Sequence, residues 1–288
     1  MKTIILLLTL AFGILFPQGH VLSFLLKYFL MGLLLFAFLD IQIDKNVIKK
    51  SHFYILTANI IVPLVLYFLL NLFNHQLAQT AFITALAPTA IAAPVVISIL
   101  RRKVEYVAFS LLLTNIVIAL LVPFLLTNFA GNSSSINIWT VFYPVLIVFS
   151  IPLLLGQALK YFLPVVHSFL TRFKDDSFYL LMGAIYLGTS NASNYLRTEM
   201  HQSFDIVLYI GITSFLICFL NFNFGRFLGG KDFSIEGGQS LGQKNNAFTI
   251  WIALTFISPL AVVGPVFYVL FQNLFISWEL YHHTKRSD

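Results

Sequence analysis

The sequence predicts an all-α integral membrane protein, and three of its features carry that prediction. Of the 288 residues, 59% are hydrophobic and only 10% are charged, whereas a soluble domain carries roughly 25% charged residues. The mean hydropathy is +0.88. The apolar residues fall into long runs, and about 20 apolar residues are enough to span a bilayer. Only short loops separate the runs, which leaves no room between them for a soluble catalytic or sensor domain.

We count ten candidate spans along the chain. The first, at residues 3–16, follows Lys2. We expect it to be a retained helix, because a small-x-small cleavage site is missing, although a cleaved secretory signal is the alternative. The other spans lie at residues 21–41, 53–73, 78–100, 104–129, 138–163, 178–195, 206–227, about 240–257 and 259–278.

Lys and Arg concentrate in the loops that follow even-numbered spans and near the two ends of the chain. The loops after spans one, three, five and nine contain neither, and the loop after span seven has only Arg197, beside Glu199. This bias predicts that both termini are cytoplasmic. It also accounts for the net charge of +6, so we expect the lipid bilayer and not nucleic acid as a partner. The lack of organelle signals favours a bacterial inner membrane.

The sequence argues against an intramembrane enzyme. Such an enzyme would need a nucleophile or a metal-ligand set within the spans. The single cysteine, Cys218, lies in an apolar run, and the seven histidines fall at predicted span ends or in loops. We therefore predict no enzymatic activity, no bound metal and no cofactor, with sodium kept open as a doubtful ligand.

Ten spans divide into two halves, residues 1–130 and 131–288. Because five is odd, the second half enters the membrane in the opposite orientation to the first. This relation is expected for an inverted-topology repeat. The fourth span of each half is interrupted. In the first half Pro88 and Pro94 break the pattern, since proline removes a hydrogen-bond donor. In the second half five polar residues do so: Ser240, Gln243, Lys244, Asn245 and Asn246.

Lys244 is the residue that most needs an explanation. A cationic side chain at bilayer depth costs several kcal/mol unless it lines a cavity or finds partners. Alternatively, Lys244 lies at the membrane surface and span nine begins at Ala247. Against this, residues 247–257 are too few to cross a bilayer without the polar stretch. Thr114 and Asn115 interrupt span five, where an Asn normally faces other protein, either at a site or in a helix–helix hydrogen bond.

Four segments make the chain resemble the bile acid:sodium symporter family, within the group of ten-helix carriers that includes arsenite and riboflavin transporters. Residues 29–40 resemble its Met-Gly-rich early helix, and residues 87–101 are similar in spacing to its first crossing helix. Gly242 and Asn245 fit its second crossing motif, and residues 259–273 resemble its last helix, with Asn273 in place. The resemblance implies a panel of helices, a core with two crossing broken helices, and uptake of an organic anion by alternating access, commonly with sodium.

The chain departs from that family at the residues that bind sodium. The family's Glu aligns with Ser240 and its Gln with Lys244, and polar ligands of the first crossing helix align with Ile91, Ala93 and Pro94. A Lys ammonium supplies one positive charge and three donors. We therefore hypothesise that Lys244 stands where a sodium ion would, or that it gains and loses a proton during transport.

These arguments predict a secondary transporter, symporter-like, for a small organic anion. The alternatives are a sodium-dependent symporter with other ligands, and a channel or sensor of the same fold. The predicted substrate- or ion-binding residues are Thr89, Pro94, Thr114, Asn115, Ser240, Gln243, Lys244, Asn245, Asn246, Gln272 and Asn273.

Overall fold

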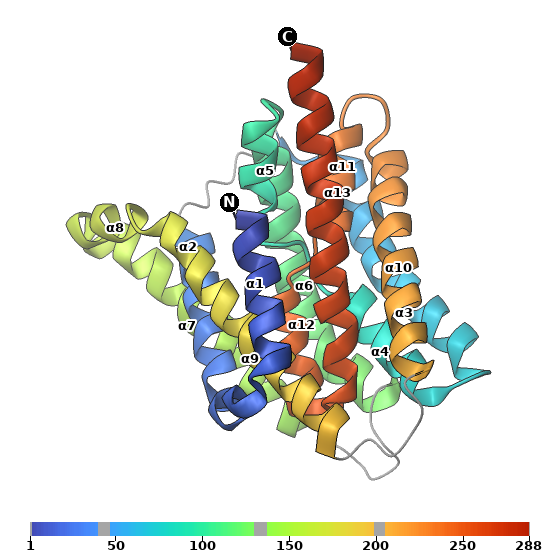
Figure 1. The fold of residues 1–288 in the computed structure, drawn as a ribbon. Coiled ribbons are helices and arrows are strands. Elements are labelled where there is room, and N and C mark those ends of the chain that lie inside the picture. The colour runs from blue at the N-terminus through green and yellow to red at the C-terminus, as the bar shows by residue number, and fades with distance from the viewer. Residues whose placement is uncertain (1, 40–46, 130–136, 199–204, 288) are drawn as a thin grey trace. The chain divides into compact units, whose positions relative to one another are not determined.

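The computed structural model describes residues 2–39, 47–129, 137–198 and 205–287, and every named element in them is a helix (Figure 1). The predicted end of span two at residue 41, Asp40, Glu199 and the boundary between the halves after residue 130 lie outside this description. The elements are α1 (Lys2–Leu15), η1 (Pro17–Leu25), α2 (Leu26–Leu39), α3 (Lys50–Asn71), α4 (His75–Leu86), α5 (Ala93–Ile99), α6 (Val104–Phe129), α7 (Ile138–Phe162), α8 (Pro164–Thr171), η3 (Lys174–Asp176), α9 (Ser177–Thr198), α10 (Asp205–Gly229), α11 (Ser234–Gly242), α12 (Asn246–Ile252), η4 (Ala253–Ile257), η5 (Leu260–Val262) and α13 (Val263–Ser287).

Six helical segments are long and apolar enough to cross a membrane. They match the predicted spans two, three, five, six, eight and ten, so the helical, membrane-embedded class is confirmed. The remaining predicted spans correspond to the short apolar α1, to the more polar α9, and to two helices that are each split into shorter pieces. The total of ten spans stays a prediction.

The helices form two compact units, and each unit is built from separated stretches of the chain. The first takes Met1–Ile41, Ala119–Gln202 and Ala247–Val262. The second takes Gln42–Ile118, Ser203–Asn246 and Val263–Asp288. Each unit therefore contains helices from both predicted halves, and neither half is a compact unit by itself.

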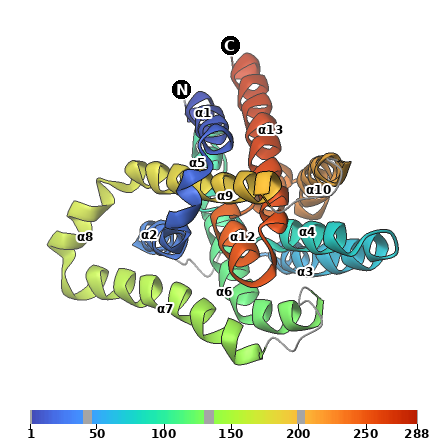
Figure 2. The ribbon, with the colours of Figure 1, turned by 60° about the horizontal axis from the view of Figure 1, so that its bottom comes forward.

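In the first unit, α2 packs against α7 and α9, and α1 packs along α9. Figure 2 shows α7, α8 and α9 following one another around α2. The helix α8 was not predicted, because it directly follows span six, where we expected a loop. None of its residues is buried. Pro164 begins it, at a position where a missing N–H is tolerated.

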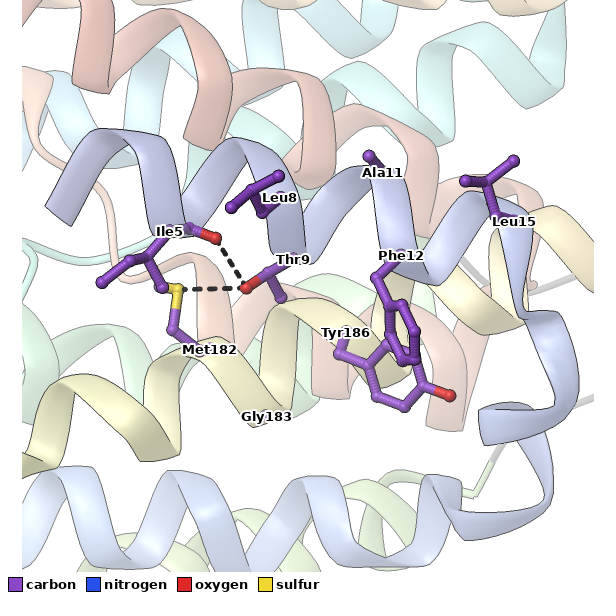
Figure 3. A pocket seen from close by; sticks show the side chains of 9 residues that line it. All are labelled: Ile5, Leu8, Thr9, Ala11, Phe12, Leu15, Met182, Gly183 and Tyr186. Carbon is purple, nitrogen blue, oxygen red and sulfur yellow. Dashed lines mark hydrogen bonds between the residues drawn. The ribbon is translucent and has the colours of Figure 1, made fainter. Parts of the chain in front are cut away.

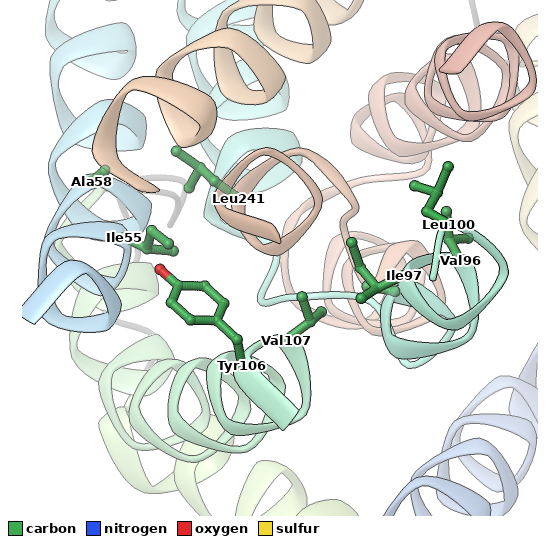
Figure 4. Close-up of a cluster of buried hydrophobic side chains, with 9 residues drawn as sticks. Ile55, Ala58, Val96, Ile97, Leu100, Tyr106, Val107 and Leu241 are labelled. Atoms are coloured by element: carbon green, nitrogen blue, oxygen red, sulfur yellow. The ribbon is translucent and has the colours of Figure 1, made fainter. Parts of the chain in front are cut away.

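In the second unit, α3 packs along α4 and α10 packs along α11. The last pair approaches closely because Gly225 and Gly229 of α10 face Gly237 of α11, and small residues let two membrane helices come together. A cluster of apolar side chains from α3, α5, α6 and α11 fills the interior beside this pair (Figure 4). In that view Ile55, Tyr106 and Leu241 point toward one another.

Glu236 lies in a helix and not in the loop predicted between spans eight and nine. Span eight was predicted to end at residue 227 and span nine to begin at about residue 240, but α10 continues to Gly229 and α11 already begins at Ser234. Glu236 is consequently in the first turn of α11 and only 1% exposed. His52, just before predicted span three, is also buried, and its Nε2 lies 3.1 Å from the carbonyl oxygen of Tyr106.

Candidate functional site

The first interruption separates α4 from α5. Ala87, the residue before Pro88, has φ −47° and ψ 132°, because a following proline disfavours the helical conformation. The chain stays out of the α-helix until Ala93, and Pro94 lies in the first turn of α5, where proline is pre-organised for a helix. The predicted break at these prolines is present, and it exposes backbone groups that need new partners.

The second interruption separates α11 from α12 and carries the predicted polar residues. The helix α11 ends at Gly242, and Gln243 has the extended conformation φ −80°, ψ 114°. Gly242 lies against the ring of Phe222, where a side chain would not fit. The Tyr268 hydroxyl donates to the Gly242 carbonyl at 2.8 Å, which satisfies one of the carbonyl groups at the end of α11.

The two interruptions meet as a short antiparallel pair within the second unit. Thr89 and Lys244 form an isolated β-bridge. The Ala90 N–H donates to the Gln243 carbonyl at 2.9 Å, and the Asn245 N–H donates to the Pro88 carbonyl at 2.8 Å. Backbone groups freed at membrane depth must be satisfied inside the protein. Each break therefore supplies partners for the other.

Side chains of α6 fix the first interruption in place. The Thr114 hydroxyl lies 3.0 Å from the Thr89 hydroxyl, and the Thr89 N–H donates to Thr114 Oγ1 at 3.1 Å. Asn115 Nδ2 donates to the Thr89 carbonyl at 2.9 Å. Thr89 Oγ1 in turn donates to the Ser240 carbonyl at 2.6 Å. Residue 89 thus ties α6 to the end of α11, and these side chains hold the crossing geometry.

Lys244 is 2% exposed, so its side chain lies inside the second unit. Its depth in the bilayer stays a prediction. Its N–H donates to Gln272 Oε1 at 3.0 Å, and its Nζ donates to Asn59 Oδ1 of α3. The buried carboxylates of this unit have other partners. Glu236 Oε1 accepts from the Lys103 N–H at 3.2 Å, and Glu279 forms an ion pair of 2.7 Å with Arg226. Among the residues that the structure describes, no carboxylate is bonded to the Lys244 ammonium.

A chain of side-chain hydrogen bonds leads away from the crossing. Gln243 Nε2 donates to Gln239 Oε1, and Gln239 Nε2 donates to Glu279 Oε2. At the end of this series, Arg226, whose side chain is 27% exposed, donates to Glu279 Oε1. The arrangement connects the neighbour of Lys244 to a partly exposed cation through fully buried amides.

The structure brings most of the predicted residues together but leaves two outside the network. Asn273 donates to the Val269 carbonyl of its own helix at 2.7 Å, and Pro94 is half-buried and only begins α5. The residues that the structure does gather at or beside the crossing are Thr89, Thr114, Asn115, Ser240, Gln243, Lys244, Asn245, Asn246 and Gln272.

Sequence reasoning missed Asn59, Gln239, Tyr268 and Glu279 as contributors to this network. Asn59 had a usable signal, because an Asn within an apolar span normally faces other protein. Glu279 did not, since a carboxylate near the end of a span is ordinarily solvated. Its burial depends on Arg226 and Gln239 reaching it from other helices.

Loss of the Thr89 hydroxyl is expected to destabilise the second unit. Thr89→Val keeps the side-chain shape but removes the donor to the Ser240 carbonyl, whereas Thr114 still donates to the Ser110 carbonyl at 2.8 Å. Leaving such a buried group unpaired costs about 1–3 kcal/mol. Detergent-solubilised protein should therefore show a lower unfolding midpoint, whereas Thr57→Val, at an exposed position of α3, should leave the midpoint unchanged. Equal midpoints for the two variants would contradict the role given to Thr89.

The first unit contains a separate groove between α1 and α9, with a volume of about 570 Å³ (Figure 3). Phe12 and Tyr186 face each other in it with ring centroids 5.4 Å apart. Thr9 Oγ1 lies 3.6 Å from the Met182 sulfur and donates to the Ile5 carbonyl at 2.8 Å. The groove is mainly apolar and contains none of the predicted site residues.

The fold and the site together define the protein as a helical membrane protein in which two interrupted helices pair through their breaks around a buried lysine. The sequence matches no family model and no curated protein.

Proposed function

We propose that the protein is a secondary carrier for a small organic anion, which works by alternating access, and that Lys244 takes the place of a coupling cation. The observation that carries the proposal is the buried Lys244 ammonium at the paired interruptions, bonded to one amide oxygen. A buried cation without a carboxylate partner favours an anionic ligand. Half-helix ends near such a site add partial charges and free backbone groups for binding.

The pattern of helix contacts supports the inverted repeat that this mechanism uses. In an inverted repeat, each span of one half corresponds to the span five places away in the other half. Replacing α3 and α4 by their counterparts gives α10 and α11, and both pairs are packed. The same exchange turns α1–α9 into α7–α2 and α4–α10 into α11–α3, which are again packed pairs. Each compact unit also takes corresponding spans from the two halves. These relations are what a panel and a core built from two repeats would have.

Glu236 supports a second candidate, a sodium-dependent symporter with ligands unlike those of the family that the sequence resembles. Its side chain is buried in α11, and its Oε2 has no hydrogen-bond partner among the described residues. A free carboxylate oxygen is a suitable ligand for a hard cation. In this mechanism Glu236 and not Lys244 would couple transport to an ion.

Uptake into proteoliposomes tests both candidates. A panel of labelled organic anions is offered with sodium, without sodium, and with an imposed proton gradient. We expect saturable uptake that is indifferent to sodium and is stimulated by unlabelled substrate inside. Sodium-stimulated uptake that disappears in Glu236→Gln would favour the second candidate, and stimulation by the proton gradient would indicate that Lys244 exchanges a proton. Non-saturable flux without counter-stimulation would indicate a channel.

A further inference from the structure

Asn59 is the side chain of the second unit that has an unexplained donor next to Lys244. It lies on α3 and is 2% exposed. Its Oδ1 accepts from Lys244 Nζ, but its Nδ2 has no hydrogen-bond partner in the part of the chain that the structure describes. Reversing the amide would point Nδ2 at the ammonium and bring two donors together, so hydrogen bonding determines the orientation. A buried amide donor without a partner is unfavourable, which suggests that a ligand completes it.

Lys244 has spare donors at the same place. An ammonium carries three N–H groups, and the hydrogen bond to Asn59 uses one of them. Because Oδ1 and Nδ2 belong to one planar amide, an acceptor that contacts the ammonium beside Oδ1 also comes within reach of Nδ2. The two side chains thus have unused donors next to each other, and one of the donors is charged.

Two buried serines of the second unit also have unused hydroxyl groups. Ser110 and Ser240 are buried, and the hydroxyl oxygen of each has no hydrogen-bond partner among the described residues. Along the chain, Asn59 and Ser240 adjoin Ala58 and Leu241 of the apolar cluster, and Ser110 lies one helical turn beyond Tyr106. The unused polar groups therefore belong to three helices that also contribute to the cluster. The buried carboxylates, Glu236 and Glu279, bond elsewhere.

We infer that Lys244 and Asn59 form a binding site for one monovalent anion, and that in transport this anion is the carboxylate of the substrate. The second step rests on the proposed function, whereas the site itself does not. Lys244 supplies the charge that compensates the carboxylate, and Asn59 directs one of its oxygens through Nδ2. Both donors then have an acceptor, and the buried cation has a counter-ion. Chloride has the same charge and accepts the same hydrogen bonds, so it is the alternative source of the anion.

Asn59→Asp is the sharpest test, because it builds the counter-ion into the protein. The new carboxylate replaces the anion beside Lys244, so the variant should no longer respond to added anions. Purified protein is titrated with potassium acetate or potassium chloride while its melting temperature is followed. For the wild type we expect a saturable rise of about 5 °C as the site fills. For Asn59→Asp we expect a higher melting temperature at low salt and only the general salt response.

Lys244→Gln is the second variant, and it decides the question if Asn59→Asp does not fold. It removes the charge, so its melting temperature should show only the general salt response. Both variants and the wild type share that general response. A saturable rise in acetate but not in chloride assigns the site to carboxylates, and a rise in chloride assigns it to a resident inorganic anion. A wild-type curve that matches both variants, or a full response in Asn59→Asp, overturns the inference. If the protein transports anions but its melting temperature shows no saturable response to them, this site is refuted and the carrier function stands. If the melting temperature responds but no transport is found, the site stands and the carrier function is refuted.

Discussion

Uptake of an organic anion is expected to be lost in Lys244→Gln, although the protein remains folded in the membrane. Glutamine keeps a polar side chain at the crossing but removes the charged group that donates to Asn59. A buried carboxylate that loses its cation partner is destabilised by about 3–5 kcal/mol, and each 1.4 kcal/mol is a tenfold change in binding. Initial uptake at low substrate concentration should therefore fall by at least about two orders of magnitude.

The matched control is Lys231→Gln, which removes the same charge at an exposed turn between α10 and α11. It should transport like the wild type. Lys244→Arg keeps the charge but replaces a compact ammonium by a larger planar group, so it should recover only part of the activity. Reconstituted Lys244→Gln with unchanged helical circular dichroism and full uptake would refute the role of the lysine, both as a substitute for a cation and as a proton carrier.

A side chain at residue 237 is expected to prevent α10 and α11 from packing. A Cβ on Gly237 would contact the Gly225 carbonyl oxygen and lie 2.9 Å from Gly229 Cα. Both contacts are to backbone, which cannot rotate away, so the helices would have to separate. Overpacking of this kind costs about 1–3 kcal/mol for small additions and more for large ones. Gly237→Ala should lower the unfolding midpoint, and Gly237→Val should yield little monodisperse protein after detergent extraction.

Gly211→Ala is the comparison within α10. Its Cβ would lie 3.5 Å from the Phe267 ring, an ordinary van der Waals distance, so extraction yield and midpoint should be unaffected. Because α11 ends beside the second interruption, the surviving fraction of Gly237→Ala should also transport more slowly. A stable and fully active Gly237→Val would show that the two helices do not need this close approach.

Some of the site was predictable because its signals are local. Proline at residues 88 and 94 breaks a helix whatever surrounds it, and polar residues before an apolar run mark the second break. The burial of Lys244, Thr114 and Asn115 followed from the cost of polar groups in a membrane. Gln272 and Asn273 were predicted together, but adjacent residues of a helix point about 100° apart. Only Gln272 reaches the crossing, and sequence alone does not choose between them.

The sequence by itself determined the class of the protein, its apolar helices and the places where two of them are interrupted, because hydropathy, proline and charge act over short stretches of chain. Only the tertiary structure decided that the two breaks bond to each other, that Lys244 meets Asn59, and that Glu236 is buried within a helix. These contacts join residues far apart in the chain. They depend on which face each helix presents and how closely two backbones approach, and no local pattern encodes either.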